Sequence, residues 1–187
     1  MDRERMVDVA VSVVSRFGAQ ALNLTSVARH AGVGRATAYR MFGGRDELLA
    51  AIVDREVSVL HERMDSWMLA VDDPHDKVHT LVTKTLTYIR EHEALQYLLR
   101  NEPGELVSTL VASGPDRATD TTIIDVIVQR CLPDLDAQPA LAGALHPDGR
   151  GASEFAARVV YSHMLVPGSS MTDDQVADLV CRAVLGG

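Results

Sequence analysis

Apolar residues recur every three or four positions along most of this chain, which is the period of an α-helix with one buried face. The first such run ends at Phe17, and Gly18 then predicts a helix stop. Two shorter helices are predicted next, one capped by Thr25 and ended by Gly32, and one over residues 35–42. Three helices therefore fit within the first 45 residues.

A longer helix is predicted from near Gly44 to about Leu69. Its first turn carries Asp46 and Glu47, whose carboxylates complement the exposed N–H groups at a helix start. The following helix is predicted to begin at Asp73-Pro74, because aspartate caps helices and proline is favoured at the first helical position.

Glycine and proline divide the rest of the chain. They predict shorter helices over residues 104–145, with breaks at Pro133 and over residues 146–151. Strand patterns are nearly absent, so the expected fold class is all-α. Two antiparallel helices are predicted to close the chain, over residues 153–165 and 172–185, the second beginning with a Thr172–Gln175 capping box.

Charge is distributed unevenly in this chain of 187 residues and net charge -8. Residues 1–45 hold seven arginines against three carboxylates, a balance of +4, whereas residues 46–187 hold 11 basic side chains against 23 acidic ones, a balance of -12. No carboxylate lies between Asp8 and Asp46. This segregation indicates a small polyanion-binding head on an acidic body.

The two cysteines, Cys131 and Cys181, stand apart without the spacing of a zinc or redox motif. We interpret both as core thiols in a reducing compartment. No apolar run approaches the ~18 residues of a membrane span. We therefore expect a soluble cytoplasmic protein.

Residues 27–42 have the pattern of a helix-turn-helix. Ala28 is small enough to let a second helix approach, Gly32 permits the positive φ of a tight turn, and Val33 and Ala38 fill the space between the helices. The outward side of the second helix then carries Arg35, Thr37 and Arg40, with Tyr39 at its flank. Such donors suit phosphate oxygens and base edges.

This segment resembles the DNA-binding region of the TetR family of transcriptional regulators. The resemblance covers roughly residues 5 to 50, with Ser or Thr commonly found in the family where Gly34 opens the recognition helix. The matching residues are Phe17-Gly18, Leu24-Thr25-Ser26-Val27-Ala28, Ala31-Gly32-Val33, Thr37-Ala38-Tyr39-Arg40-Met41-Phe42 and Arg45-Asp46-Glu47-Leu48-Leu49.

The resemblance implies an N-terminal three-helix helix-turn-helix DNA-binding domain over residues 1–45. A larger helical effector-binding and dimerisation domain would follow over residues 46–187. It also implies a homodimer whose recognition helices lie about 34 to 36 Å apart on a palindromic operator. Phosphate contacts are expected from Thr25, Tyr39 and Arg45, and major-groove contacts from Arg35, Ala36, Thr37 and Arg40.

Two further residue sets in the body are candidates for function. Ordinary core packing also accounts for any single member of the first set. The expected effector-pocket residues are Met64, Trp67, Met68, Tyr88, His92, Tyr97 and Phe155. The expected dimer-interface residues are Phe155, Val159, Val160, His163, Val176, Leu179, Val180 and Ala183.

The resulting hypothesis is a transcriptional repressor that leaves its operator when a small-molecule effector binds the body. The alternative is a helical small-molecule-binding protein or enzyme whose basic head does not read DNA sequence. We expect no enzyme activity and no cofactor, since no catalytic arrangement stands out. Metal binding by His75 and His79, one helical turn apart, is left open. Activation in place of repression, the effector, the operator and the regulated genes are left open too.

Overall fold

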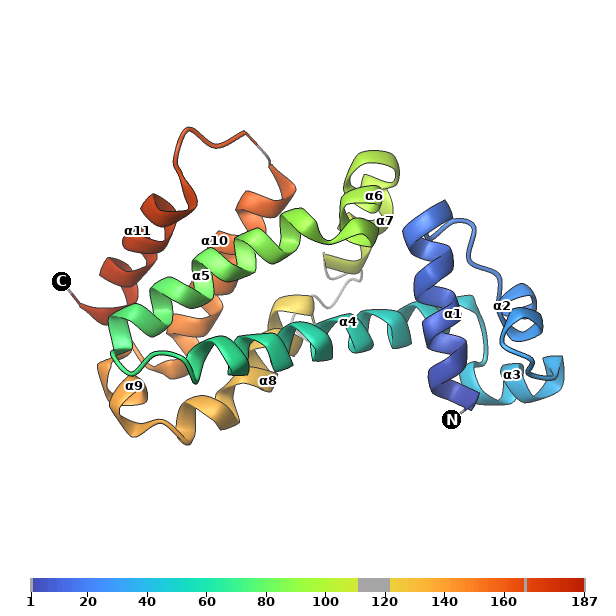
Figure 1. The fold of residues 1–187 in the computed structure, drawn as a ribbon, viewed down its shortest axis with the longest axis horizontal. Coiled ribbons are helices and arrows are strands. Elements are labelled where there is room, and N and C mark those ends of the chain that lie inside the picture. Colours follow the sequence, from blue (N-terminus) through green and yellow to red (C-terminus); the bar gives the residue numbers. More distant parts are fainter. Residues whose placement is uncertain (1, 111–121, 167, 187) are drawn as a thin grey trace, which may run out of the picture. The chain divides into compact units, whose positions relative to one another are not determined.

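The computed structural model describes residues 2–110, 122–166 and 168–186, and every regular element in these ranges is an α-helix (Figure 1). The all-α class expected from the sequence is confirmed. Among the described helices, none combines the length and hydrophobicity needed to span a bilayer. The helices are α1 Asp2–Phe17, α2 Leu24–His30, α3 Arg35–Phe42, α4 Arg45–Met68, α5 Pro74–Glu91, α6 Glu93–Asn101, α7 Pro103–Leu110, α8 Ile123–Asp136, α9 Pro139–Ala144, α10 Gly149–Leu165 and α11 Asp173–Leu185.

The chain forms two compact units, each made of two separate stretches of sequence. The first unit consists of Met1–Val59 and His92–Val107, and the second of Leu60–Glu91 and Ser108–Gly187. Helices α4 and α7 therefore contribute residues to both units. A domain boundary after residue 45 stays a prediction.

A shared apolar core holds the helices of the first unit together. Helix α1 contributes Met6, Ala10 and Val14, which follow the helical period and are fully or almost fully buried. Ala94 of α6 is buried in the same cluster. Gly18 ends α1 with a φ of +84°, and its N–H donates to the Val14 oxygen at 2.9 Å. The predicted stop at Gly18 is confirmed.

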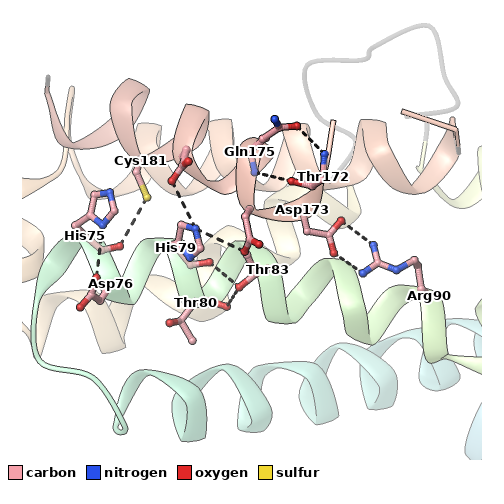
Figure 2. Close-up of polar contacts among 12 residues, drawn as sticks. His75, Asp76, His79, Thr80, Thr83, Arg90, Thr172, Asp173, Gln175 and Cys181 are labelled. Carbon is pink, nitrogen blue, oxygen red and sulfur yellow. Dashed lines mark hydrogen bonds and ion pairs between the residues drawn. The ribbon is translucent and has the colours of Figure 1, made fainter. Parts of the chain in front are cut away.

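In the second unit α11 packs against α5, and Figure 2 shows polar contacts between these two helices. Arg90 Nη1 donates to Asp173 Oδ1 at 2.8 Å, and the Cys181 thiol donates to the His75 backbone oxygen with a donor–acceptor distance of 3.7 Å. The two helices also bury valines that recur at helical spacing, namely Val78 and Val82 of α5 and Val176, Val180 and Val184 of α11.

The predicted helix starts are confirmed at two sites in this unit. Asp73 Oδ1 accepts a hydrogen bond from the His75 N–H at 2.8 Å, so α5 begins at Pro74. Thr172 and Gln175 form the capping box of α11, each side chain accepting from the other residue's backbone N–H (Figure 2).

The cap of α2 was wrongly predicted. Asn23, not Thr25, caps this helix, with Oδ1 accepting from the Ser26 N–H at 3.1 Å. Asparagine is among the best N-cap residues, and a helix start two residues earlier than predicted also buries Leu24. Thr25 consequently lies in the first turn of α2.

The predicted break at Pro133 is wrong, and the predicted break over residues 146–151 is confirmed only in its first part, because α9 ends at Ala144 and α10 begins at Gly149. Pro133 lies inside α8, which is secured at its start by Thr122 and Asp125. The Thr122 hydroxyl and N–H donate to the Asp125 carboxylate at 2.6 and 3.0 Å, and these bonds lower the pKa of Asp125. Helix α10 begins at Gly149, within the predicted break, because Asp148 Oδ1 caps it by accepting from the Gly151 N–H at 2.7 Å.

Candidate nucleic-acid interface

The turn between α2 and α3 is closed by backbone hydrogen bonds. The Val33 N–H donates to the Ala28 oxygen at 2.8 Å, and Gly32 adopts a φ of +69°. A Cβ added at Gly32 would meet no atom within 4 Å. Glycine is therefore required here by backbone conformation and not by lack of space.

The inner face of α3 is fixed by two buried residues. Ala38 is fully buried and Phe42 nearly so, and both belong to the core of the first unit. The Arg3 guanidinium of α1 lies 5.2 Å from the centre of the Phe42 ring. These contacts set which residues of α3 face outward.

The outer face of α3 carries most of the residues expected to contact DNA. Arg35, Ala36, Tyr39 and Arg40 are exposed, and Thr37 is partly exposed. The Arg35 guanidinium lies 5.5 Å from the centre of the Tyr39 ring, a cation–π contact that orients the arginine along the helix surface. Five of the seven expected DNA-contact residues therefore share one short helix.

The helix begins at Gly34, which has no side chain to cap it. Its φ of -63° and ψ of 140° are open to other residues, and an added Cβ would meet only Thr37 Oγ1, at 3.9 Å. The first N–H groups of α3 thus lack a side-chain acceptor at the N-cap.

The other two expected contact residues lie on neighbouring helices of the same unit. Thr25 is exposed on α2. Arg45 is the first residue of α4 and is half-buried, with Nη2 donating to the Ala19 oxygen at 3.0 Å. Its Nη1 lies 3.2 Å from Asp46 Oδ1 and its Nη2 3.5 Å from Glu105 Oε2. The Arg45 side chain is thus held by the protein itself.

Basic charge prevails on the surface of this region. Arg16, Arg29, Arg35 and Arg40 are all exposed in the stretch that lacks carboxylates. Asp8, the last acid before this stretch, forms an ion pair with Arg55 at 3.2 Å.

One contact of the region had no sequence signal. Glu102 Oε2 accepts hydrogen bonds from the backbone N–H groups of Ala19 at 2.7 Å and Gln20 at 3.2 Å. A Cβ at Gly18 would lie 2.2 Å from Glu102 Oε1 and 2.8 Å from Tyr97 Cε1. The Glu102 carboxylate thus accepts hydrogen bonds from the backbone N–H groups that follow α1, and Ala19 lies 83 residues away in the sequence.

The expected effector-pocket residues are divided between the two units. His92 and Tyr97 belong to the first unit, and the others to the second. His92 accepts from the Leu95 N–H through Nδ1 at 3.2 Å, so Nε2 carries the proton and donates to Glu56 at 2.7 Å. His92 therefore caps α6. In the second unit Met68 is buried, Met64, Trp67 and Tyr88 are half-buried, and Phe155 is exposed.

The expected dimer-interface residues fall into three groups by exposure. Val160, Val176 and Val180 are buried within their own subunit, and Val159 and His163 are half-buried. The exposed members are Phe155 at 45%, Leu179 at 49%, and Ala183.

The two histidines that left metal binding open stack at a ring-centre distance of 6.2 Å. His75 Nδ1 lies 3.6 Å from Asp76 Oδ1 (Figure 2). His79 Nε2 lies 3.6 Å from Asp178 Oδ1. The described part of the chain contains two triads of possible metal-ligating residues, and within each triad the ligand atoms lie within 4.8 Å of one another. Neither triad contains both histidines.

Comparison with known proteins gives a family and a fold. Residues 6–52 match the family described as "Bacterial regulatory proteins, tetR family". The HTH-type transcriptional regulator BetI of Rhizobium meliloti is 31% identical over 80 residues, which are 43% of this chain and 39% of BetI. The HTH-type transcriptional repressor KstR of Mycolicibacterium smegmatis is 29% identical over 82 residues, 44% of this chain and 40% of KstR. The chain spans less than half the length of the curated relatives it matches.

The fold agrees over a much longer stretch. The transcriptional repressor QsdR of R. erythropolis, a TetR-family structure, superposes with a TM-score of 0.67 at 22% identity. That superposition covers 99% of this chain and 94% of QsdR. Residues 6–52 thus match the TetR family of bacterial regulatory proteins, in agreement with the helix-turn-helix geometry, and the chain as a whole shares the fold of QsdR.

Proposed function

We propose that this protein is a sequence-specific DNA-binding regulator of transcription. The observation that carries the proposal is the exposed polar face of α3, presented by a buried Ala38 and Phe42 within a stretch that has no carboxylate. A short helix with outward arginines is suited to the major groove, where arginine recognises guanine through two hydrogen bonds.

Within this proposal the seven contact residues divide into two roles. Arg35 and Arg40 each hydrogen-bond a guanine, while Ala36 and Thr37 lie against neighbouring base edges. Thr25, Tyr39 and Arg45 contact phosphates, which fix position and carry no sequence information themselves. Arg45 reaches a phosphate by exchanging its contacts with Asp46 and Glu105 for one with the DNA.

The active species of the proposal is a homodimer. One eight-residue helix reads too few base pairs for a unique operator, and two copies related by two-fold symmetry read a palindrome. Phe155, Leu179 and Ala183 offer exposed apolar area on α10 and α11 for this contact. Val160, Val176 and Val180 support those helices from the subunit core.

We further propose repression that is relieved by a small molecule bound in the helical body. The effector acts by preferring the protein geometry that does not fit the operator, so that its binding and DNA binding oppose each other. KstR is named a transcriptional repressor, which supports repression over activation. The family consists of regulators and not enzymes, which disfavours the enzyme alternative. The regulator would act in the cytoplasm, where bacterial DNA lies.

Selection from random duplex DNA tests the proposal. The full-length protein is expected to enrich a palindrome, and its binding weakens steeply as salt rises. Arg35→Ala is expected to cost about 1 to 3 kcal/mol at one base pair of each half-site and to relax the preference there. Arg45→Ala is expected to weaken all sequences alike and to reduce the salt slope by about 1.

Arg100→Ala is the matched control, because it removes an exposed arginine from α6, outside the expected contact set. Its operator affinity and preference should equal those of the wild type. Salt-insensitive binding without an enriched palindrome, unchanged by Arg35→Ala, would leave the helical small-molecule-binding protein or enzyme as the better reading.

A further inference from the structure

Three side chains of the second unit converge where α4 meets α8. His61 and Asp65 lie one turn apart on α4, and Asp134 comes from α8. His61 Nε2 lies 2.7 Å from Asp134 Oδ2, and His61 Nδ1 lies 3.7 Å from Asp65 Oδ2. One ligand atom from each of the three lies within 4.8 Å of the other two.

The surroundings of this triad suit a cation. The side chains of His61, Asp65 and Asp134 are 21%, 39% and 37% exposed, so an ion can enter without being fully hydrated once bound. With a neutral imidazole the triad carries a charge of about -2, which a divalent ion would balance. Burial and the negative charges of Asp134 and Asp65 raise the pKa of the neighbouring Cys131 thiol to about 11. The negative charges of Asp65 and Asp134 therefore both act on the same neighbouring group.

The second triad in the described part of the chain, Asp73, His75 and Asp76, is different in kind. All three residues are exposed, and Asp73 Oδ1 already accepts hydrogen bonds from the N–H groups of His75 and Asp76 at 2.8 and 3.3 Å. This carboxylate is therefore engaged in capping α5. The capping role explains that triad without a ligand.

We propose that His61, Asp65 and Asp134 form a binding site for a divalent transition-metal ion such as Zn²⁺. One imidazole nitrogen and one oxygen from each carboxylate supply three protein ligands, and water completes the coordination. The imidazole favours zinc and its neighbours over Mg²⁺ and Ca²⁺, which prefer shells made of oxygen. The ion replaces the His61–Asp134 hydrogen bond and joins α4 to α8 across 73 residues of sequence.

Calorimetric titration of the EDTA-treated, untagged full-length protein with Zn²⁺ tests the site. One ion per chain is expected to bind at the triad, and Mg²⁺ at the same concentration is expected not to displace it. His61→Ala is expected to weaken that binding more than about 100-fold, because even partners outside the coordination shell contribute about 10- to 100-fold. Asp134→Asn and Asp65→Asn, which preserve shape, should each weaken it at least about 10-fold.

His75→Ala is the control, since it removes a histidine from the other triad. It should leave the affinity of the site unchanged. Thermal melting gives a second readout: Zn²⁺ should raise the melting temperature of the wild type and His75→Ala, and not of Asp134→Asn. Absence of Zn²⁺ binding, binding that survives all three triad substitutions, or binding lost in His75→Ala would each overturn the proposal.

Discussion

The helix-turn-helix region and the α5–α11 pair are both helices packed together, yet they constrain their sequences differently. The former requires particular residues at particular positions: glycine at 32 for its positive φ, and small Ala28 and Ala38 at buried positions. The latter uses valines at helical spacing with ion pairs such as Arg90–Asp173 at the edge. Many sequences meet the second demand and few meet the first. Residue identities therefore predict a function in the helix-turn-helix region, whereas in the α5–α11 pair they predict only the fold.

The largest expected effect is a difference in stability between alanine substitutions at Gly18 and Gly32, which both have a positive φ. Gly18→Ala should lower the free energy of unfolding by about 2 to 4 kcal/mol, because its Cβ meets Glu102 and Tyr97 in addition to the strain of positive φ. Gly32→Ala should cost only about 1 kcal/mol, since space around it is open. Urea denaturation measures both. Equal losses would show that Glu102 does not press on the Gly18 turn.

The next effect concerns the two thiols, both in the second unit. Burial is the main reason that the pKa values of Cys131 and Cys181 rise from 9.0 to about 11. At pH 8 their thiolate fraction is thus about 100-fold below that of an ordinary thiol. Alkylation by iodoacetamide should be slower by at least this factor in the folded protein than in urea.

The same shifts fix the pH dependence of stability. The folded pKa of each thiol exceeds its unfolded value, so this stabilisation is complete below about pH 9 and is lost as the pH rises toward 11. Unfolding free energies measured between pH 8 and 11 should therefore fall. Rapid alkylation at pH 8, or stability that rises over this range, would contradict the packing of the thiols.

Removal of a helix cap is expected to reduce stability by a smaller amount, and by a similar amount in each of the two units. Asn23→Ala and Thr172→Ala each remove the side-chain oxygen that accepts from the first turn of a helix. Each should cost about 1 kcal/mol. Their denaturation midpoints, compared with the wild type, test whether local capping is equally important in the basic and acidic regions. A Thr25→Ala loss larger than that of Asn23→Ala would restore Thr25 as the cap.

The smallest expected effect is a gain in stability from a substitution at Gly34. Gly34→Ser places a hydroxyl where α3 lacks a side-chain cap, at a backbone conformation open to serine and without a close contact. The free energy of unfolding should rise by a few tenths of a kcal/mol. Thermal melting detects such a shift, and Gly34→Ala, which adds a Cβ without an acceptor, is its control. An equal change in both variants would mean that the hydroxyl makes no cap.

Much of the fold followed from the sequence because helix starts and stops are local signals. Residues 35–42 were predicted as the helix that α3 occupies, and Asp73-Pro74 and Thr172–Gln175 begin their helices as expected. The error at the start of α2 has a tertiary cause. Asn23 and Thr25 are both good caps, so burial of Leu24 decides between them, and burial is a property of the tertiary structure.

The outward face of α3 could be predicted because it follows from the inward positions of Ala38 and Phe42. The role of Glu102 could not, since a carboxylate that binds N–H groups 83 residues away leaves no trace in a local pattern. The same holds for His61 and Asp134, which are 73 residues apart. The contact roles of Thr25, Arg35, Ala36, Thr37, Tyr39, Arg40 and Arg45 stay predictions.

The hydrogen bonds from Ala19 and Gln20 to Glu102 bear on how such regulators are recombined. A helix-turn-helix segment cut from this chain after α3 would lose the Glu102 carboxylate that accepts from the N–H groups after α1, together with the buried Ala94. Chimeras that exchange specificity need to transplant residues 92–107 along with the head, or supply an equivalent acceptor from the recipient. The compact unit that contains the helix-turn-helix is accordingly discontinuous in sequence.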